Sequence, residues 1–137
     1  MTQANAWSDR PAPSLDDIGE LASAAFEALP EKFRKMAGDV VIHIYDFPDE
    51  EVLEELGIED PFELTGLYSG HPVSAESSFV SGEMLPIIHL FRRPLLDEWV
   101  ETGVSLESLI THVIVHEVGH HFGLSDADMH ALESEGE

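Results

Sequence analysis

Cysteine is absent from the chain. Its absence excludes disulfide frameworks and thiolate metal sites, so any metal ion must be bound by nitrogen and oxygen ligands. Long apolar runs are also lacking, and none approaches the ~20 residues that a membrane-spanning helix needs. Residues 1–14 have neither a basic start nor an apolar stretch, so we expect no signal peptide and a cytoplasmic location.

Basic side chains are scarce. Six lysines and arginines stand against 28 acidic residues, which gives a formal net charge of -22, and no basic residue lies between residues 36 and 91. Such a charge repels phosphate groups, so we expect neither a nucleic-acid nor a membrane partner. Residues 46–63 carry nine carboxylates. They act either as an electrostatic guide for cationic substrates or as a solvated face that keeps the protein soluble.

The length of 137 residues fits one domain. Residues 1–13 are polar and contain proline, which predicts a flexible tail, and residues 14–137 form the single domain. The order of the patterns indicates an α+β fold, in which a small mixed sheet packs against helices. Helices are predicted from Ser14 to Leu29, Pro48 to Gly57, Leu95 to Glu101, Ser105 to His121 and Asp126 to Glu133. Strands are predicted at 39–47, 64–70 and 83–91, and Pro86 places the last of them at a sheet edge or a bulge.

Histidine is abundant, and five of the eight histidines lie between residues 112 and 130. At their centre is an HExxH motif, formed by His116, Glu117 and His120. Residues four apart in a helix share a face, so the two imidazoles can bind one ion. Glu117 is placed to act on a water bound to that ion, as a general base. HExxH alone would arise by chance in roughly six of a hundred chains of this composition, so its surroundings matter.

A third ligand is needed for a catalytic zinc site with one open position. Asp126 is the candidate, but in a continuous helix it would lie about 9 Å beyond His120 along the axis. Gly123 can adopt the left-handed conformation that ends a helix and turns the chain back. Ser125 and Asp126 are also typical of a helix start. The alternative third ligands are therefore Asp128, His130 and Glu133.

The stretch from Val113 to Asp126 resembles the metzincin motif, with Asp126 in place of the last histidine. It is similar to the HExxHxxGxxD motif of minimal zincin-like metallopeptidases, which are short bacterial proteins with an active-site helix near the C-terminus. The resemblance implies one zinc ion bound by His116, His120 and Asp126. It also implies Glu117 as general base, and an edge strand that docks an extended peptide, for which 85–91 is the candidate.

Other residues near the motif have weaker assignments. His112 and His121 are expected to support the ligands rather than to bind the metal. Gly119 costs ~1 kcal/mol of helix propensity relative to alanine, which indicates close packing. Three side chains could stabilise an oxyanion, with packing as the ordinary alternative for each: Tyr45, Tyr68 and His89.

The sequence therefore predicts a zinc-dependent metallopeptidase that acts on a peptide or protein substrate, with a bias towards basic peptides. The non-enzymatic alternative is a zinc-stabilised binding module on the same scaffold. A metal-dependent endoribonuclease is a further alternative, because one such family spaces three histidines at similar intervals. The acidic third position, Glu117 and the net charge of -22 all argue against it.

Overall fold

The computed structural model describes residues 11–69 and 86–136. It is an α+β fold with a small mixed sheet, as predicted. The helices are α1 (Leu15–Glu27), α2 (Glu31–Ala37), α3 (Glu50–Leu56), the short 3-10 helix η2 (Pro61–Glu63), α4 (Arg92–Thr102), α5 (Leu106–His121) and α6 (Asp126–Gly136). The strands are β1 (Val41–Tyr45), β2 (Gly66–Ser69) and β3 (Ile87–Phe91).

The N-terminal helix begins as the sequence predicts. Ser14 and Asp17 form a reciprocal capping box, in which the Asp17 amide donates to the Ser14 hydroxyl and the Ser14 amide donates to the Asp17 carboxylate. Most of the predicted tail, residues 1–10, lies outside the described residues. At its end the carbonyl of Pro13 accepts a hydrogen bond from the Arg92 guanidinium. The described chain is therefore already anchored to the domain at this residue.

The sheet has the order β1-β3-β2. β3 pairs in parallel with β1 and antiparallel with β2. The prediction that this segment lies at a sheet edge is therefore wrong. Pro86 stands just before the strand, where its carbonyl accepts a hydrogen bond from Val41, so it removes no donor from the ladder. The edges are β1 and β2, while residues 70 and 83–85 of the predicted strands lie outside the described residues.

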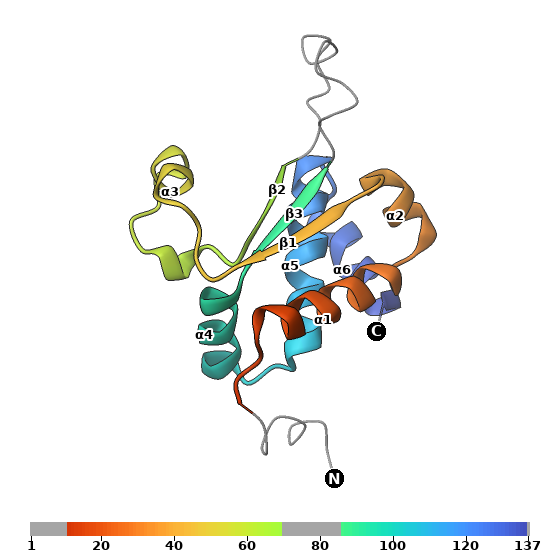
Figure 1. Cartoon of the computed structure of the whole chain (residues 1–137). Helices are drawn as coiled ribbons and strands as arrows, with labels where there is room; N and C mark the ends of the chain where they lie inside the picture. The colour runs from red at the N-terminus through yellow and green to blue at the C-terminus, as the bar shows by residue number, and fades with distance from the viewer. Residues whose placement is uncertain (1–10, 70–85, 137) are drawn as a thin grey trace.

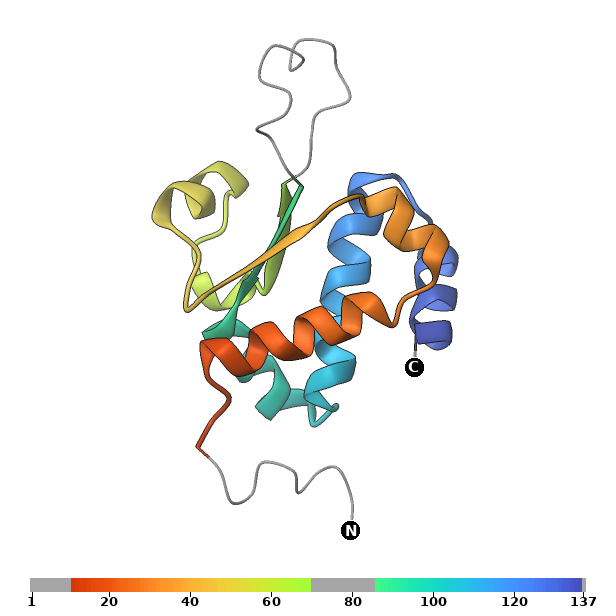
Figure 2. The same ribbon diagram turned by 45° about the vertical axis from the view of Figure 1, so that its right-hand side comes forward.

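One face of the sheet is covered by helices. The central residues of this face, Ile88 and Leu90, are completely buried. Gly66 of β2 lies so close to α5 that a Cβ atom there would be 2.5 Å from Cγ1 of Val113. In Figures 1 and 2, α5 lies between the sheet and α6, and α3 stands apart from both helices. The packing thus places α5 against the edge strand β2.

The longest helix is buried on most of its surface, and its exposed residues are Glu107, His112, His120 and His121. It carries buried residues along its whole length, including Leu109, Ile114 and Val118, as the continuous apolar pattern predicts. Ser105 caps its first turn by accepting a hydrogen bond from the Ser108 amide. Among the described helices, none is both long enough and apolar enough to cross a bilayer.

Candidate metal centre

Three histidines follow one another along α5 at intervals of four residues: His112, His116 and His120. The rings of His112 and His116 have centroids 4.0 Å apart, and those of His116 and His120 are 5.6 Å apart. Because four residues make slightly more than one turn, the three imidazoles form a continuous row on one side of the helix. The HExxH pair thus forms the two C-terminal members of a row of three histidines.

Gly123 turns the chain between α5 and α6. Its φ of 77° is left-handed, as predicted. The Leu124 amide donates to the Gly119 carbonyl and the Gly123 amide donates to the His120 carbonyl, which is the hydrogen-bond pattern of a Schellman motif. This turn sends α6 back along α5, so residues that are far beyond the HExxH motif in sequence reach its neighbourhood.

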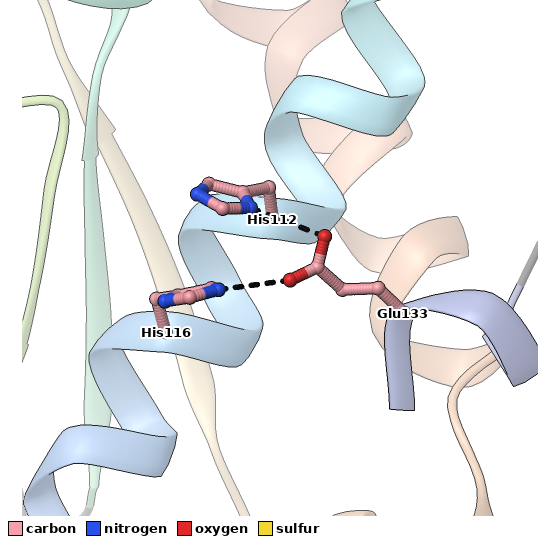
Figure 3. Close-up of side chains that lie close together, drawn as sticks. All are labelled: His112, His116 and Glu133. Carbon is pink, nitrogen blue, oxygen red and sulfur yellow. Dashed lines mark hydrogen bonds and ion pairs between the residues drawn. The ribbon is translucent and has the colours of Figure 1, made fainter. Parts of the chain in front are cut away.

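A carboxylate from α6 lies against the histidine row (Figure 3). Oε2 of Glu133 is 2.9 Å from Nε2 of His116, and Oε1 is 3.1 Å from Nδ1 of His112. The Glu133 side chain is only 19% exposed. Within the described part of the chain, this is the one group of three potential ligands whose donor atoms all lie within 4.8 Å of one another. Two imidazoles and one carboxylate suit zinc, which is bound by nitrogen and oxygen ligands in proteins without cysteine.

The predicted ligands are only partly brought together. His116 and His120 lie one turn apart on α5, whereas Asp126 is an exposed residue at the start of α6. Ser125 and Asp128 form the capping contacts there, so the carboxylate of Asp126 is not used as a cap. The assignment of Asp126 as third ligand, with His116 and His120, stays a prediction.

Glu117 lies beside this row in a partly buried position. Burial raises the pKa of its carboxyl above the ordinary value, and the charge of the neighbouring His120 opposes that rise. A carboxylate that is costly to ionise without a nearby cation is a suitable proton acceptor when a metal ion is bound close to it. The role of Glu117 as general base stays a prediction, and this environment is compatible with it.

Of the three oxyanion candidates, only Tyr68 lies on the α5 side of the sheet. Its ring is 4.8 Å from that of His121, and burial raises the pKa of its hydroxyl. The Tyr68 hydroxyl makes a long hydrogen bond of 3.5 Å to the Ala37 carbonyl. His89 and Tyr45 occupy strand positions that point to the opposite face, because they alternate with Ile88 and Ile44, which pack into the core beneath the sheet.

The glycine inside the motif has a packing role, as predicted. A Cβ atom at Gly119 would lie 2.5 Å from Sδ of Met129. Met129 is completely buried and belongs to α6. The missing side chain therefore lets α6 approach the HExxH turn of α5, which also brings Glu133 within reach of His116.

His112, which the sequence predicts to support the ligands, lies in the structure within the group of potential ligands formed with His116 and Glu133. Its spacing of four residues from His116 is the same signal that identifies the HExxH pair, and it extends the motif towards the N-terminus. Glu133 is one of several alternatives on the last helix. Which of these alternatives reaches the histidine row depends on the angle between α5 and α6, and the local sequence does not specify that angle.

Comparisons with known proteins identify the family of the chain. A family model described as zincin-like metallopeptidase matches residues 37–136, which include the whole sheet and the helices α3 to α6. In a comparison with curated proteins, none matches the chain. The match covers most of the chain and includes the HExxH motif, so this protein belongs to the zincin-like metallopeptidase family.

Proposed function

We propose that the protein is a zinc-dependent peptidase in which His116 and His120 bind the metal ion and Glu117 is the general base. The observation that carries this proposal is the placement of these three residues within two adjacent turns of α5, a helix whose apolar residues are buried in the core. The match to the zincin-like metallopeptidase family supports the same reaction class. Asp126 is the proposed third ligand.

The proposed chemistry assigns the proton transfers to Glu117. A bound zinc ion supplies a Lewis acid that lowers the pKa of a coordinated water to about 7 and polarises a carbonyl group. The Glu117 carboxylate accepts a proton as the peptide carbonyl is attacked, and it then delivers that proton to the leaving amine. The partly buried position of Glu117 limits competition from bulk water for this transfer.

The edge strand β2 is the proposed docking site for the substrate backbone. The Phe91 amide donates to the Thr65 carbonyl, and hydrogen-bonded pairs alternate along an antiparallel ladder. Gly66 and Tyr68 therefore direct their backbone groups away from β3. An extended peptide can pair with these groups by strand addition, beside α5. This strand replaces 85–91 as the candidate for peptide docking.

The charge of the protein favours basic substrates. The net charge of -22 and the acidic segment at 46–63 attract cationic peptides and accelerate their encounter. We expect peptides rich in lysine and arginine to be cleaved faster than acidic peptides of the same length at low salt. The preference should fall as salt is added, because screening shortens the range of the attraction. Equal rates for the two peptide sets at low salt would refute this substrate class.

The experiment that tests the reaction compares Glu117→Gln with the wild type. Both zinc-loaded proteins are incubated with a fluorogenic peptide library, and their zinc content is measured on the same samples. We expect the variant to retain zinc and to lose turnover. Glu107→Gln is the matched control, because Glu107 is an exposed residue in the first turn of the same helix. Unchanged cleavage by Glu117→Gln would eliminate the proposed general base.

A second candidate function is a non-catalytic binding module stabilised by zinc. The contact of Glu133 with His116 favours it, because an ion bound there would join α5 to α6. This candidate predicts a melting temperature that rises with zinc while no peptide or RNA substrate is cleaved. Peptide cleavage that disappears in Glu117→Gln would reject it.

A further inference from the structure

The contact between α5 and α6 contains a metal-binding set that differs from the HExxH set. We propose that His112, His116 and Glu133 bind a divalent transition-metal ion such as Zn²⁺ as a set of their own, which shares His116 with the HExxH pair. The proposal does not rest on peptidase activity. It stands on three side chains from two packed helices whose donor atoms lie within 4.8 Å of one another.

The two contacts of Glu133 with the histidines are close in length to the separation of ligands around a bound metal. Two ligands at 2.0–2.1 Å from a tetrahedral zinc ion lie about 3.3 Å from each other. The observed separations from Glu133 are 2.9 Å to His116 and 3.1 Å to His112. These two contacts involve different oxygens of the same carboxylate, and the three donor atoms of the set lie within 4.8 Å of one another. Rotations of the Glu133 carboxylate and of the exposed His112 side chain bring the donor atoms around one ion.

The donor atoms already point at a common place. Figure 3 shows one nitrogen of each imidazole facing the Glu133 carboxylate, which offers one oxygen to each ring. Glu133 is 19% exposed and His116 is 24% exposed, whereas His112 is 49% exposed. The site is thus shielded on the α6 side and open beside His112. That opening gives an ion a path of entry and leaves room for a water as fourth ligand.

His116 belongs to both metal-binding sets, so only one of the two sets can be occupied at a time. Nε2 of His116 is the atom directed at Glu133, and one imidazole nitrogen binds one ion at a time. A single ion is therefore distributed between the His112–His116–Glu133 set and the HExxH set. Occupancy of the first set holds α6 against α5, because its carboxylate ligand belongs to α6 and its imidazoles belong to α5.

The experiment uses the full chain with His120→Ala and Asp126→Ala combined, which removes the HExxH set. Both residues are exposed, so their substitution leaves the core intact. Zinc affinity is measured by competition with a chromophoric chelator. We expect this double variant to bind one Zn²⁺ per chain. Addition of His112→Ala or Glu133→Gln should then weaken binding at least 10-fold.

Two control substitutions are made in the same double variant. Glu107→Gln removes an equivalent carboxylate from an exposed position in the first turn of α5, and Ser134→Ala alters the exposed neighbour of Glu133 on α6. Two results would overturn the proposal: no zinc binding by the double variant, or losses in His112→Ala and Glu133→Gln no larger than in these controls.

Nitrogen NMR of the histidines of the double variant provides a second measurement, in which no HExxH set competes for the ion. Nδ1 of His112 is the ring atom that faces Glu133, so zinc bound between these residues must shift its resonance. An unshifted resonance at saturation would also overturn the proposal.

The outcome is separable from that of the proposed function. Loss of peptide cleavage in Glu117→Gln tests the reaction and leaves the zinc affinity of the His112 set unaltered. Conversely, a double variant that binds no zinc would reject the His112 set alone, and the peptidase assay on the wild type would remain informative.

Discussion

The contact between Gly119 and Met129 allows a quantitative test of how α6 is held against the motif helix. An alanine Cβ at position 119 would lie 2.5 Å from Sδ and 2.9 Å from Cγ of the buried Met129. Overpacking of this kind costs ~1–3 kcal/mol, and the better helix propensity of alanine returns ~1 kcal/mol. Gly119→Ala should therefore reduce the free energy of unfolding by up to ~2 kcal/mol.

The effect of Gly119→Ala on the free energy of unfolding should change sign when the side chain of Met129 is removed. Met129→Ala alone should cost ~2–5 kcal/mol, because it leaves a cavity in the core. In that background Gly119→Ala meets no obstacle, so it should stabilise the protein by ~1 kcal/mol. The predicted coupling between the two positions is thus ~1–3 kcal/mol.

Urea denaturation of the four metal-free proteins, followed by circular dichroism, measures this cycle. Thermal melts provide a second reading, since 1 kcal/mol corresponds to about 3 to 4 °C for a chain of this size. An effect of Gly119→Ala that is the same in both backgrounds would refute the packing argument. It would mean that Gly119 is not the residue that sets the approach of α6.

Three further predictions concern backbone conformation and pH. Gly123→Ala should lower the melting temperature by the equivalent of ~1–2 kcal/mol, because φ at this position is 77°; no loss would show that the turn is not held left-handed. Burial, and secondarily the charge of His43, lowers the pKa of His89. His89 therefore contributes stability above its unfolded pKa of about 6.5 that is lost as the pH falls through its lower folded pKa. Urea titrations at several pH values should show this loss in the free energy of unfolding of the wild type and not in that of His89→Gln. The same dependence of the free energy of unfolding on pH in both proteins would contradict the assignment. Burial raises the pKa of Glu117, so ionisation of this group destabilises the metal-free chain as the pH rises through the folded pKa. Glu117→Gln should then melt at a higher temperature than the wild type at neutral pH with chelator present, and a lower melting temperature would contradict this.

Local signals in the sequence predict most of the helices correctly. Ser14, Ser105 and Gly123 mark helix ends through hydrogen bonds between residues only a few positions apart, so sequence alone reveals them. The short helix α2 escapes prediction, because Pro30 is equally typical of the end of the preceding helix. In the structure Pro30 precedes the first turn of α2, where its missing amide is not needed.

Contacts between residues far apart in the sequence explain why the remaining features were predicted wrongly or not at all. Whether a strand lies at an edge depends on its partners, and β3 has partners on both sides because β1 arrives from far earlier in the chain. The HExxH face follows from helix periodicity and could be predicted. The approach of Glu133 to His112 and His116 could not, because it depends on the Gly119–Met129 contact between two helices.

The most direct test of the metal centre is the zinc content of the wild type and of His116→Ala. His116 belongs both to the HExxH pair and to the group with His112 and Glu133. Elemental analysis after equilibration with zinc should find one ion per wild-type chain and none in His116→Ala. His43→Ala, which alters an exposed histidine on the sheet, should retain the ion. A wild type that binds no zinc, or a His116→Ala variant that still binds one ion per chain, would contradict the account.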